Sequence, residues 1–246
     1  MSDASNPQER RWSPLSLRER RVLGVLVEKQ KTTPDVYPMS IAGIVTGCNQ
    51  KSNRDPVTSY DADDVEEILI GLRKKGAAIQ VEGSGRVEKW RHNLYEWLDL
   101  RGQGVAMAVL AELMLRGAQT VGELRGRAAR MDPIPDLETL QPILENLAER
   151  GLVVFLTPPG QRRGVTVTHG LMPPEELERV RQSVASASDR DDDEPRPARS
   201  GGGGAASSSA GLAAEVATMR TELETLRGIV ETLSADVQAL KNSLGG

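Results

Sequence analysis

The stretch DADDVEEILIGLRKKGAAIQVEGSGRVEKWRHNL, residues 61–94, decides the fold because it joins two kinds of periodicity. Asp61 is a suitable N-cap for a helix, and Gly76 is a suitable residue to end one. Between them, apolar residues recur at helical spacing, at Val65, Ile68, Leu69 and Leu72. Residues 77–94 predict two strands joined by the turn Gly83-Ser84-Gly85. The stretch therefore predicts a helix followed by a β-hairpin.

Two more helices are predicted before this unit. SLRERRVLGVLVEK, residues 16–29, opens with a capping-box pattern formed by Ser16 and Glu19. YPMSIAGIVTGC, residues 37–48, places apolar side chains on one helical face, at Ile41, Ile44, Val45 and Cys48. Three helices followed by a hairpin form the plan of a winged-helix domain, which is a variant of the helix-turn-helix.

The second half of the chain repeats this order. Residues 105–117, 120–131 and 136–151 predict three helices, and residues 152–171 predict a second hairpin. The third helix of the first half has a residue pattern that recurs in the second half. At a constant offset, the matching residues are Asp136, Ile143, Leu144, Leu147 and Gly151. A helix start near Thr139 would place Pro142 in the first turn, where proline costs no hydrogen bond. The predicted fold class is mainly α with small β-hairpins (α+β), in tandem winged-helix domains.

Composition divides the chain into seven predicted segments. The stretch around residues 185–210 is acidic and rich in Gly and Ser, so it cannot bury enough apolar surface to fold. The predicted organisation is a disordered N-terminus at residues 1–13, winged-helix domains at 14–97 and 103–172 joined by a linker at 98–102, a helical extension at 173–184, a disordered linker at 185–210 and a coiled coil at 211–244.

The C-terminal segment has an unbroken heptad repeat. Charged pairs across a parallel dimer, such as Glu215 with Arg220 and Glu222 with Arg227, are attractive. The alternative is one amphipathic helix that folds back on its own domains, but the seam is narrower than such a helix needs. We expect a homodimer. The predicted dimerisation residues are Leu212, Val216, Met219, Leu223, Leu226, Val230, Leu233, Val237, Leu240 and Leu244.

Bulk composition restricts the function classes. The 246 residues carry a net charge of −4, whereas nucleic-acid binders usually show a basic surplus. The one cysteine, Cys48, excludes an intramolecular disulfide, and no apolar run reaches membrane-spanning length. We therefore expect a cytoplasmic protein without a membrane partner.

The sequence contains no pattern typical of an active site. It has no phosphate-cradling glycine loop, no nucleophile elbow and no Cys or His spacing for a metal. The prediction is a non-enzymatic protein with no catalytic residue, no cofactor, no metal and no evident small-molecule substrate.

Two partner classes stay open: DNA, bound by a regulator-like protein, and a protein partner docked on a dimeric scaffold. Base reading by the third helix is disfavoured because its first turn is acidic at Asp61, Asp63 and Asp64. Cations lie elsewhere, but each group also fits a plain solvated surface. The candidate partner or DNA-binding residues are Gln50, Lys51, Asn53, Arg54, Arg86, Lys89, Arg91, Arg125, Arg127, Arg162 and Arg163.

The polar loop between the second and third helices has two interpretations. It lies within EKQKTTPDVYPMSIAGIVTGCNQKSNRDPV, residues 28–57, and has no counterpart in the second half. As a structural brace, Asn49, Asn53 and Asp55 would bond to nearby backbone and Arg54 would be buried against a carboxylate. As a recognition surface, Lys51 and its neighbours would touch a partner.

These residues, together with LRGAQTVGELRGRAARM at residues 115–131, closely resemble the YceH-like proteins of bacteria. The resemblance covers residues 14–175. It implies two winged-helix domains and, in many members, a C-terminal coiled coil, but no established activity. The family signature falls on Tyr37, Pro38, the run from Cys48 to Val57, Arg116, Gly117, Gln119, Thr120, Gly122, Glu123, Leu124, Arg125 and Arg127.

Overall fold

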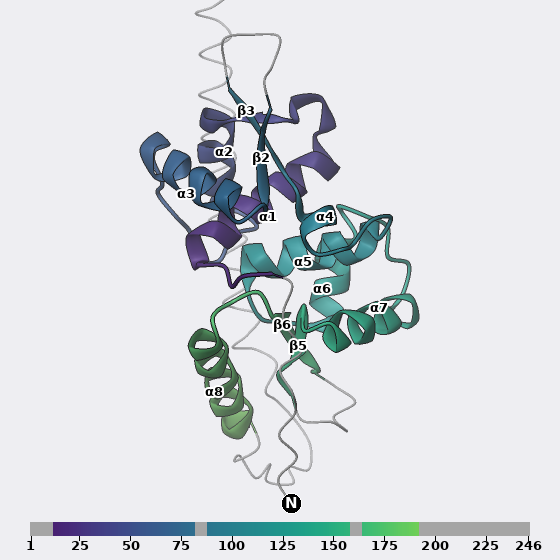
Figure 1. The fold of residues 1–246 in the computed structure, drawn as a ribbon. Helices are drawn as coiled ribbons and strands as arrows, with labels where there is room; N and C mark the ends of the chain where they lie inside the picture. Colours follow the sequence, from purple (N-terminus) through teal and green to yellow (C-terminus); the bar gives the residue numbers. More distant parts are fainter. Residues whose placement is uncertain (1–11, 82–87, 158–163, 192–246) are drawn as a thin grey trace, which may run out of the picture. The chain divides into compact units, whose positions relative to one another are not determined.

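The computed structural model describes residues 12–81, 88–157 and 164–191 (Figure 1). In the first half, capping boxes at Ser16 and Asp61 begin the first and third helices. Ser40 caps the second by accepting a hydrogen bond from the backbone of Gly43. The elements are α1 (Leu17–Thr32), η1 (Pro34–Val36), β1 (Met39–Ser40), α2 (Ile41–Cys48), α3 (Ala62–Lys74), β2 (Ala78–Val81) and β3 (Lys89–His92).

The second half repeats that order after the short helix α4 (Leu94–Trp97). Its elements are α5 (Gly104–Arg116), β4 (Gln119–Thr120), α6 (Val121–Ala128), α7 (Leu137–Glu149), β5 (Val153–Phe155), β6 (Thr166–His169) and α8 (Pro174–Asp191). Helices joined to small antiparallel sheets confirm the predicted α+β class. The order of elements is compatible with the winged-helix plan.

Each half has a three-stranded sheet rather than the two strands predicted. The strand orders are β1-β3-β2 and β4-β6-β5, and all pairs are antiparallel. The extra strands pair Met39 with Trp90 and Gln119 with Val167. They were missed because two residues cannot show an alternating pattern.

Three predicted boundaries differ in the structure. Helix α7 begins at Leu137, so Pro142 lies inside the helix and the carbonyl of Glu138 has no helical donor. Helix α8 continues to Asp191 through residues assigned to the linker. Trp12, assigned to a disordered N-terminus, is only 8% exposed.

The two halves share one continuous core rather than two separate cores. Helices α1 and α5 are buried along most of their length, and Gly24 allows them to approach closely. A Cβ added at Gly24 would lie 2.8 Å from Leu115 Cγ. Backbone N–H groups also cross between the halves, from Leu15 to the Leu171 carbonyl at 2.8 Å and from Asp55 to the Leu115 carbonyl at 2.9 Å.

This shared core affects the predicted domains. The predicted linker at residues 98–102 contains two buried leucines, Leu98 and Leu100. The boundaries at residues 14–97 and 103–172 stay predictions, because packing is continuous across them.

Several predictions fall outside the described residues: both hairpin turns, Arg86, Arg162, Arg163, and every residue of the predicted coiled coil. In the described part of the chain, no helix is long and apolar enough to cross a membrane.

Candidate nucleic-acid interface

The polar loop after α2 is closed by its own side chains. Asn49 accepts a hydrogen bond from the backbone N–H of Tyr60 at 2.8 Å and donates to the Tyr60 carbonyl at 2.7 Å. Thr58 Oγ1 donates to the Cys48 carbonyl at 2.9 Å. Asn amides often replace missing backbone partners in this way. Contacts within the chain therefore hold the loop at both ends, without a binding partner.

Arg54, a candidate partner residue, is buried inside this loop. Its residue exposure is 5%, and its Nη2 lies 2.5 Å from Glu28 Oε2. Its Nε donates to the Gly47 carbonyl at 2.9 Å, and Gln50 Oε1 accepts a further bond at 2.9 Å. A phosphate cannot reach this guanidinium unless Arg54 leaves Glu28. The structure thus corrects the assignment of Arg54, and of the Gln50 amide oxygen, to an accessible surface.

Two buried carboxylates, Glu28 on α1 and Glu112 on α5, organise the contact between the halves. Arg130 bridges them, with Nη1 2.6 Å from Glu28 Oε1 and Nη2 3.1 Å from Glu112 Oε2. Arg116 lies 3.3 Å from Glu112 and donates to Asn53 Oδ1 at 2.8 Å. We call Glu28, Arg54, Glu112, Arg116 and Arg130 the charge cluster.

Electrostatics within the charge cluster favour its ionised form. Burial alone would raise the pKa of Glu28, but Arg54 and Arg130 outweigh burial and lower that pKa below its ordinary value. Burial alone would lower the pKa of Arg130, but Glu28 and Glu112 raise it. Three guanidinium groups thus neutralise two carboxylates that burial would otherwise destabilise.

The loop connects the two halves through this cluster. Asn53 has a φ of 57° and reaches Arg116 of the second half, while Asp55 bonds to the backbone of Leu115. Of the candidate loop residues, Lys51 alone is exposed. The geometry supports the structural-brace interpretation for Asn49, Asn53 and Arg54.

Arg125 and Arg127 are also used within the fold. Arg125 Nη1 donates to the carbonyls of Ile134 and Pro135 at 3.1 and 2.8 Å. Arg127 Nη1 donates to Gln119 Oε1 at 2.7 Å. Both side chains are half-buried and fix α6 to its neighbouring segments.

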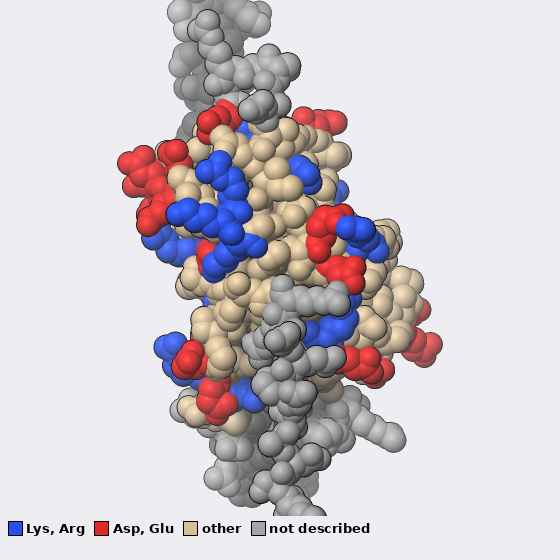
Figure 2. Space-filling view, viewed as in Figure 1, with Lys and Arg blue, Asp and Glu red and all other residues tan. Residues whose placement is uncertain are grey.

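Exposed cations gather on the first half, at the sheet and the end of α3. Lys89 and Arg91 alternate with the buried Trp90 and His92 along the central strand β3, so both project from its outer face. In the last turn of α3, Arg73 donates to Gln80 Oε1 at 2.5 Å. Figure 2 shows Lys and Arg side chains over this region. We call Arg73, Lys74, Lys89 and Arg91 the basic strip.

Three members of the basic strip are not neutralised by a described carboxylate. Arg73 lies 5.8 Å from the centre of the Trp90 ring, at the edge where α3 meets the sheet, whereas Lys89 and Arg91 project from the opposite face of β3. Lys74, Lys89 and Arg91 make no ion pair with any described residue. These groups can therefore attract an anion without first breaking such a pair.

The opposite end of α3 is acidic for structural reasons. Asp61 and Asp64 exchange capping hydrogen bonds with each other's backbone, and Arg18 pairs with Asp64. Carboxylates in a first helical turn are favoured by the helix dipole. The side chains of α3 are acidic in its first turn and basic in its last turn. Of the two ends of this helix, the C-terminal end is therefore the one suited to phosphates.

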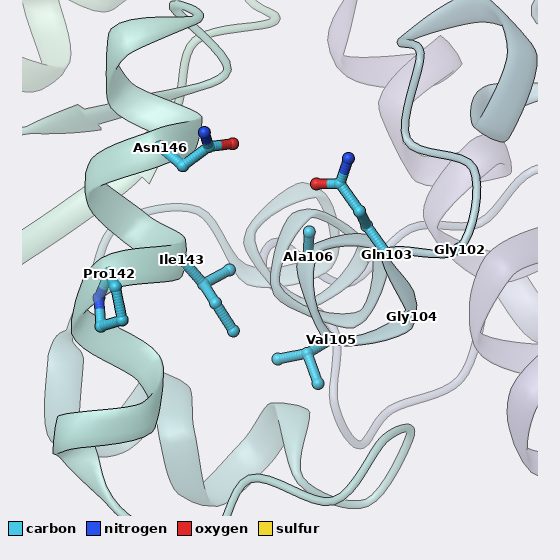
Figure 3. Close-up of a pocket in the computed structure, with 8 residues that line it drawn as sticks. All are labelled: Gly102, Gln103, Gly104, Val105, Ala106, Pro142, Ile143 and Asn146. Carbon is cyan, nitrogen blue, oxygen red and sulfur yellow. The ribbon is translucent and has the colours of Figure 1, made fainter.

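A pocket of about 520 Å³ lies between the start of α5 and the middle of α7 (Figure 3). The side chains of Val105 and Ile143 point toward one another, and so do the carboxamides of Gln103 and Asn146. No charged side chain lines it. The pocket suits an uncharged group and not a phosphate.

Among the residues that the structure describes, no three His, Cys, Asp or Glu side chains gather in a group that could hold a metal ion.

The sequence did not predict that the residues of the charge cluster come together. Glu112 gave a signal, since it is a lone carboxylate inside the apolar run of α5. Its partners could not be identified, because they come from distant parts of the chain.

These features define an α+β protein with two repeated halves that are joined by a charge cluster around two buried carboxylates. The family described as "Protein of unknown function, DUF480" matches residues 15–161. The chain belongs to this family, and the resemblance to YceH-like proteins is confirmed.

Relatives agree with that assignment. The chain is 50% identical to a UPF0502 protein of Rhodopirellula baltica over 189 residues, which cover 75% of this chain and 78% of the relative. It is 51% identical to a UPF0502 protein of Geobacter sulfurreducens over 132 residues, 54% of this chain and 59% of the relative. A UPF0502 protein of Koribacter versatilis is 43% identical over 175 residues, 69% of this chain and 81% of the relative.

Proposed function

We propose that this chain is a non-enzymatic, cytoplasmic protein that binds the phosphate backbone of double-stranded DNA through the basic strip. The observation that carries the proposal is the alternation of exposed Lys89 and Arg91 on the central strand β3. Exposed cations that alternate along one strand, and that make no ion pair with a described residue, can contact successive phosphates.

The charge pattern supports backbone contact and not base reading. The first turn of α3 carries Asp63 and Asp64, which would lie against phosphates if that end entered a groove. Lys74 and Arg73 lie at the other end of the same helix, beside the sheet. Binding is therefore proposed to depend weakly on sequence.

The proposal assigns separate roles to the candidate residues. Lys89 and Arg91 contact DNA, whereas Arg54, Arg125 and Arg127 hold the fold together. The distinction rests on burial and on hydrogen-bond partners, since each of the latter three donates to groups of the protein itself.

The test is a salt series of duplex binding. Fluorescence anisotropy of a labelled random 20-base-pair duplex, at about 50–200 mM salt, gives the slope of log affinity against log salt for the full chain. Each lost phosphate contact makes that negative slope shallower by about 0.9, so the variant Lys89→Gln/Arg91→Gln is expected to reduce its magnitude by about 1.8.

The matched control removes two charges elsewhere, as Lys29→Gln/Lys51→Gln. It changes the net charge equally and is expected to leave the slope within about 0.5 of the unsubstituted chain. Equal effects of the two variants would contradict a defined strip. No detectable binding at about 50 mM salt would refute DNA binding and favour the protein-docking scaffold instead.

A further inference from the structure

The pocket between α5 and α7 has a lining that fits one chemical class of ligand. Its volume of about 520 Å³ lies in the range of small-molecule sites. Val105 and Ile143 supply aliphatic walls, while Gln103 at the start of α5 and Asn146 on α7 supply carboxamides (Figure 3). A small number of polar groups in a mainly apolar hollow is typical of sites that orient a small ligand.

The fold does not use these two carboxamides. Gln103 immediately precedes α5, but its side chain makes no capping hydrogen bond there. Neither carboxamide has a hydrogen-bond partner among the described residues. The carboxamide of Gln141, on the same helix as Asn146, differs because it donates to Glu145 Oε1 at 2.8 Å. A ligand can therefore pair with Gln103 and Asn146 without first breaking a bond within the described chain.

The proline in α7 is a second sign that this wall of the pocket is not shaped by the helix alone. Pro142 lines the pocket and leaves the carbonyl of Glu138, one turn earlier, without a helical donor. A residue that opposes its own helix is expected more often at a functional site than elsewhere. In the pocket, the proline ring adds an apolar surface beside Ile143.

The charges around the pocket disfavour an anionic ligand. An anion would be attracted to the start of α5 by the helix dipole, but a carboxylate already lies there. A Cβ added at Gly104 would collide with the carboxylate of Asp132, which pairs with Lys31 at 2.7 Å. On the other wall, the exposed Glu145 precedes Asn146. Since no charged side chain lines the pocket itself, a neutral ligand fits it best.

We propose that this pocket binds a neutral, planar nitrogen heterocycle that carries a hydrogen-bond donor beside an acceptor, as adenine does. A carboxamide matches that edge, because its oxygen accepts and its NH₂ group donates, and Asn and Gln pair with adenine in this way. The faces of the ring then lie against Val105 and Ile143. The pocket shares no residue with the basic strip, so the inference does not rest on DNA binding.

NMR of the full chain, with labelled isoleucine and valine methyl groups, tests the site with adenine as the probe. We expect the signals of Val105 and Ile143 to shift, with a dissociation constant of about 1 mM or tighter. Purine has the same ring system without the amino donor. It is expected to bind at least about five times more weakly, because one carboxamide acceptor then stays unpaired.

The variant Gln103→Met/Asn146→Leu removes both carboxamides at exposed positions, which the fold tolerates. It is expected to bind adenine at least about ten times more weakly, and no more tightly than purine. The matched control Gln141→Met removes a carboxamide from α7 outside the pocket and should keep the affinity within about twofold. Methyl spectra without adenine show whether each variant keeps the fold.

Three results would overturn the proposal. The first is that the Val105 and Ile143 signals do not shift at about 5 mM adenine. The second is equal affinity for adenine and purine, which would mean that the carboxamides do not read the edge of the ring. The third is an equal loss of affinity in Gln103→Met/Asn146→Leu and Gln141→Met. None of these results bears on the basic strip, which the DNA titration tests by itself.

Discussion

Replacement of Glu28 by Gln removes the carboxylate at the centre of the charge cluster. The side chain of Arg54 is fully buried, and Glu28 is its one carboxylate partner among the described residues. Breaking a buried ion pair by removal of one partner costs about 3–5 kcal/mol, because the other charge stays buried and uncompensated. Since domains are stable by about 5–15 kcal/mol, the loss is a large share of the total.

Urea unfolding followed by circular dichroism measures this loss from the midpoint and slope. The exposed substitution Glu149→Gln is the control and should change stability by less than about 0.5 kcal/mol. The double variant Glu28→Gln/Arg54→Met no longer leaves Arg54 as a buried cation. Its free energy of unfolding should therefore fall by less than the sum of the losses in the two single variants, and the difference should be at least about 1 kcal/mol. A loss below about 1 kcal/mol for Glu28→Gln alone would refute the role given to the charge cluster.

Three further predictions concern the core. Gly24→Ala should destabilise the chain by about 1–3 kcal/mol in the same urea assay, because its Cβ would meet Leu115 at 2.8 Å. Burial lowers the pKa of His169 to about 3 and that of His92 to about 4, so the unfolded chain binds their protons first. Stability should therefore fall as pH drops from about 6.5 towards 4, and His169→Gln should flatten that fall in pH-dependent melting curves. Cys48, whose pKa burial raises to about 12, should react with a thiol reagent at pH 8 only when urea unfolds the chain.

Helix positions could be predicted from the sequence, because the residues that determine them are local. Asp61 accepts a hydrogen bond as an N-cap, as predicted, and the buried face of α3 consists of the four apolar residues identified from spacing. Pro142 was placed wrongly in a first turn, because Asp136 caps the helix immediately before Leu137. A local cap thus determined the helix start more strongly than the proline did.

The candidate surface was harder to predict from the sequence, because it depends on tertiary contacts. Arg54 and Lys51 look alike in the sequence, yet one pairs with Glu28 inside the protein and the other faces solvent. In the sequence Arg130 is one more basic residue beside Arg125 and Arg127, yet it links Glu28 to Glu112. Which arginine meets which carboxylate is set by the packing of α1 on α5, and no local pattern encodes that contact.

The central claim is that the basic strip contacts DNA while the loop after α2 serves the fold. Lysine acetylation of the full chain, with and without duplex DNA, tests it directly when peptides are quantified by mass spectrometry. We expect that DNA protects Lys74 and Lys89, while Lys51 is modified equally in both samples. Protection of Lys51 with no protection of Lys89 would contradict it.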